Sequence, residues 1–296
     1  MKQQGIALVQ VLIISIVLAT LALFIQTTVQ QQVASAAQVK NAFALKLELE
    51  QAQTDLFVTL LTENMYRTAQ SDNPIVKRWN FYSEPFKLSD NVTVSIQDKA
   101  SLINLNFTPD GLFSRALERL GVSEINRRKI QDSLEDWKDE DDLKRLYGQE
   151  KSDISPRKFG VPRNAYLQSE QELRYVAGAN EIPPEILERY FTTELITYFN
   201  PRNAPEYLLQ IFTNDDKLAR RIAAERKSRP LTTSEFTKVS GINTSEYISF
   251  ATSGRLRIEL KAQSQGISLT KKFDVRFQPR HPYRAVIITN SRWNQG

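Results

Sequence analysis

The first forty residues contain a long run of apolar positions. No charged residue lies between Lys2 and Lys40, and residues 6–25 are almost wholly apolar. At about 1.5 Å per helical residue this run would extend roughly 30 Å, the thickness of the hydrocarbon core of a bilayer. Neither Gly nor Pro occurs from residue 6 to about residue 70. We therefore predict one helix over 6–70 that spans a membrane and continues beyond it.

The second half of this helix is one-sided. From residue 40 to about residue 69, apolar residues recur at spacings near three and four, which is typical of an amphipathic helix. The residues on this face are Phe43, Leu47, Ala52 or Leu56, Leu60 and Tyr66. A coiled coil is the alternative, but strict heptads are not sustained. The pattern favours a stem that leaves the membrane and lies on a sheet.

Two later regions alternate apolar and polar residues, as half-buried strands do. The first region predicts three strand segments and a hairpin, at 79–83, 86–88, 92–96 and 95–106. The second region begins near residue 245 and reads as a meander of strands separated by Ser-Gly and Gln-Gly turns. We expect one antiparallel sheet built from 71–106 and 245–296.

Between these regions the pattern changes to short helices. Thr108 and Pro109 form a helix start, and Gly121 forms a stop. Further helical segments are expected at 123–137, 169–176 and 185–190, and a second helical unit at 196–244 weakly repeats the first. The fold class is therefore α+β: a long helix on an antiparallel sheet, with a large α-helical insertion at 107–195.

Composition and charge exclude several classes of catalytic site. The chain has 296 residues, of which 41% are apolar and 25% charged, enough for a sizeable core. Its net charge of +5 is spread over 39 basic and 34 acidic residues, so a polyanionic partner is weakly supported. There is no Cys and a single His, His281, which rules out sites built on Cys or on more than one His. No nucleophile and base stand at a recognisable spacing.

One acidic run is a candidate metal site. Residues 136–142 read Asp-Trp-Lys-Asp-Glu-Asp-Asp, and Gly148 and Glu150 follow. Oxygen-rich clusters suit Ca²⁺, because clustered carboxylates repel one another unless a cation compensates them. The spacing of Asp139, Asp141 and Glu150 has the length of an EF-hand loop, but Lys144 stands where that loop needs Gly. The alternative is a solvated loop whose charges meet Lys144, Arg145 and Arg157.

The two helical units resemble helix-hairpin-helix or SAM-like modules. A DNA-binding hairpin needs a Gly-hydrophobic-Gly turn, so that backbone N–H groups approach a phosphate. Here the turns read Gly-Val-Ser at 121–123 and Phe-Thr-Asn at 212–214, so one or both glycines are missing. The basic residues of these units, Arg127, Arg128, Arg220 and Arg221, are better explained as surface charge. No nucleic acid is expected.

The N-terminus resembles the class III signal of type IV pilins and pseudopilins, in which a short basic leader ends in Gly before an apolar helix. The resemblance implies cleavage by a prepilin peptidase after Gly5 and methylation of Ile6. An ordinary single-span anchor is the alternative. Pilins carry a Glu five residues into the mature chain, and this sequence has Gln10 there. The missing Glu is characteristic of the minor component K and implies that no subunit docks above this one.

Motifs along nearly the whole chain are similar in order and spacing to minor pseudopilin K of type II secretion, the general secretion pathway protein K family. They are Asn104-Leu-Asn106, the acidic run with Gly148 and Glu150, Arg163-Asn164, Glu172 to Gly178, Asn200 to Pro205, Arg229-Pro230-Leu231 and Ser245-Glu-Tyr247. The resemblance implies calcium ligands at Asp139, Asp141, Asp142 and Glu150. Lys138 and Lys151 depart from the family pattern, which leaves the number of ligands open.

The resemblance also implies a function and a place. We expect a non-enzymatic minor pseudopilin at the tip of the pseudopilus, acting in its initiation and in protein export across the outer membrane. The implied partners are the other minor pseudopilins (types I, J and H), the major pseudopilin and prepilin peptidase. The chain would cross the inner membrane once, with its C-terminal domain in the periplasm. A pilin-like DNA-uptake component and a single-span anchored enzyme are the competing classes.

Overall fold

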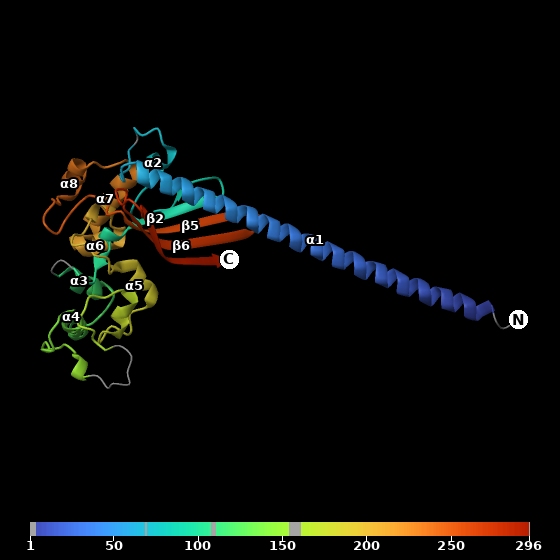
Figure 1. Cartoon of the computed structure of the whole chain (residues 1–296), viewed down its shortest axis with the longest axis horizontal. Helices are drawn as coiled ribbons and strands as arrows, with labels where there is room; N and C mark the ends of the chain where they lie inside the picture. Colours follow the sequence, from blue (N-terminus) through green and yellow to red (C-terminus); the bar gives the residue numbers. More distant parts are fainter. Residues whose placement is uncertain (1–3, 69, 108–110, 154–160, 296) are drawn as a thin grey trace.

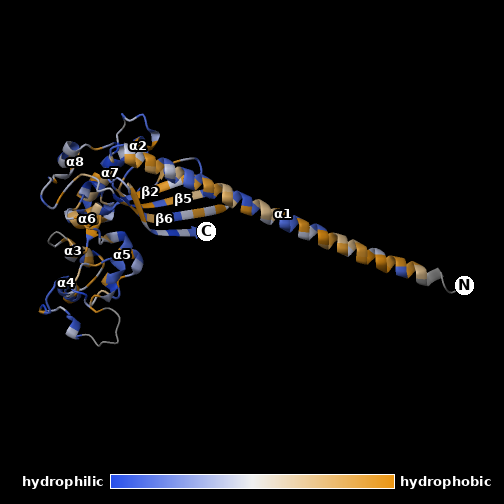
Figure 2. Cartoon of the chain, viewed as in Figure 1, coloured by the Kyte–Doolittle hydropathy of each residue, from blue (hydrophilic) through white to orange (hydrophobic). Residues whose placement is uncertain are grey.

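One long helix, α1 (Gln4–Thr62), gives the molecule its outline and extends as a rod from a compact body (Figure 1). The computed structural model describes residues 4–68, 70–107, 111–153 and 161–295. Within these ranges α1 is the one helix long and apolar enough to cross a membrane. Its N-terminal half is coloured hydrophobic along most of its length in Figure 2 and is exposed, as expected for a segment that lipid would surround.

The helix ends at Thr62, which is earlier than the predicted end near residue 70. Tertiary contacts hold the following residues outside a helix. The carbonyl oxygen of Met65 accepts a hydrogen bond from Thr252 Oγ1 at 2.7 Å, and that of Tyr66 accepts one from Trp79 Nε1 at 3.0 Å. These contacts outweigh a local helical preference, which is a weak determinant of structure on its own.

The stem packs on the sheet through one stripe of apolar side chains. Leu56 and Leu60 are buried as predicted, but Phe43 and Leu47 are 62% and 56% exposed, so that part of the predicted face is wrong. The buried stripe consists of Leu45, Leu49, Ala52, Leu56 and Leu60. Its spacing of three and four stays apolar to the end of the helix, whereas the stripe that begins at Phe43 continues into polar residues 50, 51 and 54.

The sheet has five strands in the order β1-β2-β5-β6-β7, all antiparallel. The strands are β1 (Phe86–Lys87), β2 (Val92–Asp98), β5 (Arg255–Ser264), β6 (Ile267–Phe277) and β7 (Val286–Gln295). Because β2 pairs with β5, the early and late parts of the chain form one sheet, as predicted. Gln265 and Gly266 have φ of 48° and 77° and make the tight turn between β5 and β6. The predicted meander is confirmed from residue 255 onward, whereas the predicted strand around Ile248 and Phe250 is wrong, because Ile248 makes only isolated bridges.

Two further strand predictions are wrong. Residues 79–83 form no strand: Tyr82 makes a single bridge to Gln97, and Asn80 Oδ1 accepts hydrogen bonds from the N–H groups of Tyr82 and Glu84. This side chain satisfies backbone groups that a strand would have paired. Residues 95–106 are not a hairpin, because the 3₁₀ turn η1 (Lys99–Ser101) directs the chain out of the sheet. Beyond it, β3 (Ile103–Asn104) pairs in parallel with β4 (Phe191–Thr192).

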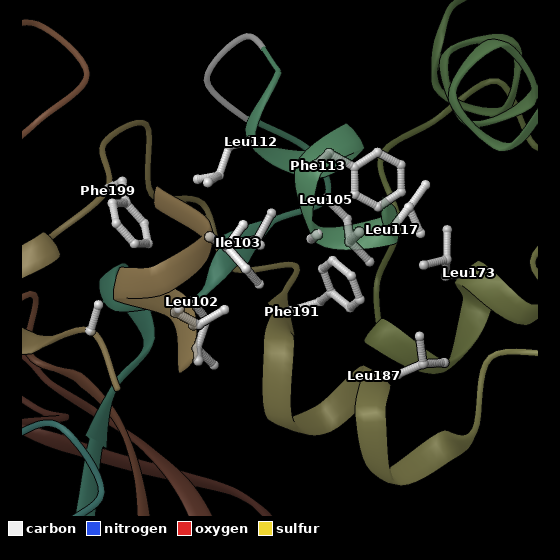
Figure 3. Close-up of a cluster of buried hydrophobic side chains, with 14 of the residues drawn as sticks. Leu102, Ile103, Leu105, Leu112, Phe113, Leu117, Leu173, Leu187, Phe191 and Phe199 are labelled. Atoms are coloured by element: carbon white, nitrogen blue, oxygen red, sulfur yellow. The ribbon is translucent and has the colours of Figure 1, made fainter. Parts of the chain in front are cut away.

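One apolar core lies among the helices between β3 and β5, and part of it appears in Figure 3. They are α3 (Leu112–Arg119), α4 (Glu124–Lys138), η2 (Lys151–Asp153), η3 (Glu170–Tyr175), α5 (Pro184–Tyr190), η4 (Pro201–Asn203), α6 (Glu206–Thr213), α7 (Asp216–Ser228) and α8 (Thr233–Ser240), and the short helix α2 (Pro74–Arg78) precedes the sheet. Leu134 of the first predicted helical unit and Ile222 of the second belong to the same core. The predicted helix start at Thr108 and Pro109 lies outside the described residues. The segment predicted at 169–176 is a 3₁₀ helix.

A network of buried charges joins the helical region to the sheet. Arg257 alternates with Leu256 and Ile258 along β5, so it lies on the sheet face opposite α1. Its Nε donates to Asp274 Oδ1 at 2.8 Å. Lys99 is 3% exposed, and its Nζ lies 3.0 Å from Asp274 Oδ2 and 3.1 Å from Glu194 Oε1. These contacts fix the insertion against the sheet.

The pKa values of this network follow from its geometry. Burial by itself would lower the pKa of Lys99, but the carboxylates of Asp274, Glu170 and Glu194 outweigh burial and raise it. Burial likewise opposes ionisation of Asp274, yet hydrogen bonds and charge from Arg257 and Lys99 bring the pKa of Asp274 well below its usual range. Lys99 and Asp274 are therefore both charged at neutral pH, and each compensates its neighbours.

Candidate metal centre

The acidic loop begins at the C-terminal end of α4. Ser123 caps this helix, since its side chain accepts a hydrogen bond from the N–H of Asn126 at 3.5 Å, and the helix predicted at 123–137 is confirmed. Its last turn carries Asp136, which is 0% exposed, and Trp137, which is 3% exposed. Trp137 belongs to the apolar core of the helical region, and Asp136 is buried beside it.

The Asp136 carboxylate is the centre of the loop. Its Oδ1 accepts a hydrogen bond from Arg145 Nη1 at 2.7 Å, and both of its oxygens lie 3.3 Å from the N–H of Arg145. A Cβ placed on Gly148 would lie 1.8 Å from Asp136 Oδ2. The backbone at Gly148 therefore closes against the carboxylate, and no residue with a side chain fits there.

Two further carboxylates of the loop have oxygens without hydrogen-bond partners. Glu150 is 1% exposed, and neither of its side-chain oxygens has a hydrogen-bond partner among the described residues. Asp139 Oδ1 is also buried and unpartnered there. Burial, and then the negative charge of Asp136, raise the pKa of Glu150. Buried carboxylate oxygens without donors are costly unless a cation or a proton compensates their charge.

Arg145 supplies the positive charge that the structure places in the loop. Its guanidinium forms ion pairs with both Asp136 and Asp139. Hydrogen bonds to Asp139 and then Asp136 raise the pKa of Arg145 further above its usual range. The alternative prediction of a solvated acidic loop is therefore wrong for Asp136 and Glu150, which are buried. It is right for Arg145, which pairs with acids of the loop.

The other two predicted ligands lie on the outer turn of the loop. Asp141 and Asp142 are exposed. Asp141 Oδ1 accepts a hydrogen bond from the N–H of Leu143 at 2.8 Å, and Asp142 Oδ1 accepts one from Asn164 Nδ2 at 3.3 Å. Lys144 pairs with Asp153 at 3.0 Å, and Arg157 lies outside the described residues. The structure thus turns Asp139 and Glu150 inward with Asp136, and it leaves the remaining pair facing solvent.

The donor set fits a hard cation such as Ca²⁺, since every candidate ligand is a carboxylate and two of them have orphaned oxygens. Among the described residues, no three acidic or His side chains form a cluster able to hold a metal ion. Calcium binding stays a prediction. Asp136 was not among the predicted ligands, although Gly148 was a clue: a glycine there allows the close approach to a buried group.

The predicted processing and docking residues all lie in α1. Gly5 and Ile6 belong to its first turns, and Gln10 is exposed on the apolar half of the rod. A position on a helix that lipid would surround is compatible with both roles, and neither role is tested by it.

The first helix-hairpin turn uses its backbone groups internally. The N–H of Gly121 donates to Glu118 O at 2.9 Å and that of Val122 to Leu117 O at 3.0 Å. The basic residues around this turn are also engaged, since Arg128 pairs with Glu124 and Arg127 donates to Val122 O. This geometry favours a structural role for the helical unit over phosphate contact.

These features define a class. A long apolar helix packed on an antiparallel sheet, with helices inserted between the early and late strands, makes this an α+β protein of the pilin-like type. A chain in the crystal structure of the GspK-GspI-GspJ complex from the type 2 secretion system of enterotoxigenic Escherichia coli has the same fold. The TM-score is 0.56 at 15% sequence identity, and the alignment covers 90% of this chain and 100% of that chain.

A family match covers the inserted region. Residues 95–193 match the family described as Type II secretion system (T2SS), protein K. None of the curated proteins compared with this sequence matches it. This part of the chain is therefore similar to protein K of type II secretion, and the whole chain shares the fold of the structural relative, in agreement with the resemblance seen in the sequence.

Proposed function

We propose that this chain is a non-enzymatic minor pseudopilin at the tip of the type II secretion pseudopilus, acting in pseudopilus initiation and in protein export across the outer membrane. The observation that carries the proposal is the position of the helical region. It occupies the end of the body away from the N-terminus and projects to one side of the sheet (Figure 1). Buried ion pairs fix it there. The helical region would sterically hinder the addition of a further subunit above this one.

Partners follow from the structural relative, which is described in a complex of GspK, GspI and GspJ. We propose that this chain likewise assembles with minor pseudopilins of the I and J types, with the H type and with the major pseudopilin below them. Its N-terminal helix would cross the inner membrane once, with the folded body in the periplasm. The apolar run at the start of α1 supports this arrangement.

The tip position can be tested in cells that assemble long pseudopili. Gold-labelled antibody against this chain should mark filament ends, and the amount of the chain per filament should stay constant as filaments lengthen. The major pseudopilin, labelled along the whole filament, is the control. Replacing Gln10→Glu should change assembly little. Label along the length of the filament, or a strong gain in incorporation of that variant, would contradict the proposal.

Processing after Gly5 is part of the same proposal. Replacing Gly5→Leu should leave the leader attached, since the peptidase needs a small residue at the cleavage site. Mass spectrometry of the wild-type protein should then show loss of residues 1–5 and methylation of Ile6, both absent in the variant. A wild-type chain that keeps its full mass would show that α1 is an ordinary anchor.

We further propose that the acidic loop binds Ca²⁺ through Glu150 and Asp139, with Asp141 and Asp142 from the outer turn and Asp136 behind them. The ion would supply the positive charge that the orphaned carboxylate oxygens lack and would tie the loop to the end of α4.

Thermal unfolding tests the metal. Calcium should raise the melting temperature of the full-length protein in detergent. The rise should be lost in Glu150→Gln and kept in Glu140→Gln, an exposed acid of the same loop. An equal rise in melting temperature in both variants, or no rise in the wild type at millimolar calcium, would contradict the proposal that the loop binds calcium.

A further inference from the structure

A small cavity lies where three distant parts of the chain meet. It has a volume of about 40 Å³ and is lined by the segment that follows α1, by residues 80–82 and by the second helical unit. Three of its lining residues are arginines, Arg67, Arg202 and Arg226. No acidic side chain lines it among the described residues. None of the residues that line the cavity belongs to the acidic loop at 136–150.

Arg226 is the most deeply buried of the three. It is 6% exposed, and its Nη1 donates to the carbonyl oxygens of Arg202 at 3.1 Å and Ala204 at 2.6 Å. Its guanidinium stacks 3.9 Å from the ring centroid of Tyr82. The Nε–H is buried and has no acceptor among the described residues. Burial lowers the pKa of Arg226 to about 10, so the group is still charged at neutral pH.

The other two arginines add positive charge without adding a counter-ion. Arg202 is partly buried, and burial lowers its pKa. Arg67 donates from Nη1 to the carbonyl oxygens of Arg226 and Lys227 at the C-terminal end of α7, both at 3.3 Å. No ion pair joins any of the three arginines to a carboxylate within the described part of the chain, although the more distant charges of Glu206 and Glu84 act on Arg226. The neighbouring acid Glu84 is engaged with Lys227 at 2.9 Å.

Carbonyl dipoles and an aromatic ring only partly compensate three guanidinium groups around one cavity. An isolated buried charge is costly unless a partner of opposite sign is present. Guanidinium groups donate in a fixed fork that suits a bound anion. The cavity holds a body about the size of one water molecule or a halide ion, and it is small for a tetrahedral oxyanion.

We propose that this cavity binds a small monovalent anion of halide size, held by Arg226 Nε and by the guanidinium groups of Arg202 and Arg67. The bound anion completes the junction between the end of the stem, the turn at residues 80–82 and the second helical unit. It stabilises the attachment of the helical insertion to the stem at a point remote from the ion-pair network on the sheet.

The first test is thermal unfolding of the full-length protein in detergent, with sodium chloride exchanged for sodium gluconate at constant ionic strength. Chloride and bromide should raise the melting temperature in a saturable way, whereas gluconate and sulfate should not. Replacing Arg202→Gln should raise the half-saturating halide concentration at least tenfold. The control, Arg229→Gln, removes an arginine that pairs with Glu225 and Glu235 outside the cavity and should leave that concentration unchanged.

The second test locates the ion. Crystals of the full-length protein grown in bromide should show an anomalous peak within reach of Arg226 Nε. A cavity that contains only water under these conditions overturns the proposal, as does a melting temperature that is the same in halide and gluconate. If the Arg202→Gln protein does not fold, the bromide peak in the wild-type protein decides the question.

Discussion

Replacing Gly148→Ala should destabilise the acidic loop through a single contact. The added Cβ would lie 1.8 Å from Oδ2 and 2.7 Å from Cγ of Asp136, far inside van der Waals distance. The backbone at Gly148 is not in the left-handed region, so it is compatible with alanine. The whole cost therefore comes from displacing a buried carboxylate.

The magnitude can be worked out from the contacts that the carboxylate would lose. Overpacking a well-packed site costs about 1–3 kcal/mol. Moving Asp136 also weakens its hydrogen bonds to Arg145, and bonds to charged groups contribute about 1.5–3 kcal/mol when buried. The Arg145 side chain is 40% exposed, which reduces that contribution. We expect a loss of about 2–4 kcal/mol in the free energy of unfolding.

The assay is urea denaturation in detergent with a chelator present, so that no bound cation contributes. Tryptophan fluorescence reports the transition, because Trp137 is buried directly beside Asp136. The matched control is the double-mutant cycle with Asp136→Ala, in which the Cβ added at position 148 no longer meets a carboxylate. In that background the same replacement should cost less than about 1 kcal/mol. Equal costs in the two backgrounds would refute the reasoning.

Three other predictions concern the stem and the ion-pair network. Leu56→Ala should lower the free energy of unfolding by about 2–5 kcal/mol in denaturation experiments, because Leu56 is 0% exposed, whereas Leu47→Ala at the exposed stripe should cost under about 0.5 kcal/mol. Lys99→Met should cost about 3–5 kcal/mol by the same measurement, since it leaves buried carboxylates uncompensated. The pKa values of Asp274 and Glu194 are lowered in the folded protein, so their contribution to stability is complete above about pH 5 and is lost as the pH falls further. A melting temperature that stays flat from about pH 5 to about pH 2 would contradict this assignment.

The arrangement of the fold was readable from the sequence wherever one periodicity extended over many residues. The apolar run, the late meander and the capped helix at 123–137 belong to this class, because each has local signals that agree with its tertiary setting. The end of the stem and the turn after Trp79 were not readable. Both depend on side chains that reach backbone groups outside their own element, such as Thr252 on Met65.

The candidate site was predicted in part for a related reason. Sequence spacing identified the acidic run, but it does not show which acids a loop turns inward. Asp136 is held by Arg145, whose Nη1 donates to its Oδ1, and by the close approach of the backbone at Gly148. Asp141 and Asp142, which stand between inward residues in the sequence, face solvent. Which acids of a loop face inward depends on the packing of neighbouring residues. That packing involves long-range contacts, which sequence spacing does not reveal.

The uninterrupted stem has a mechanical consequence. Helices bend sharply at Pro, at Gly or at bulges, and α1 contains neither Pro nor Gly from Ile6 to Thr62. Its contact with the sheet begins at Asn41, whose Nδ2 donates to Gln265 Oε1 at 2.6 Å, so roughly 24 Å of free helix separates residue 25 from the body at about 1.5 Å per residue. This free part of α1 contains no residue at which the helix would be expected to kink under force. A force applied along the axis of α1 at its apolar end would therefore be transmitted to the folded body, and the body would move by the same distance as the helix.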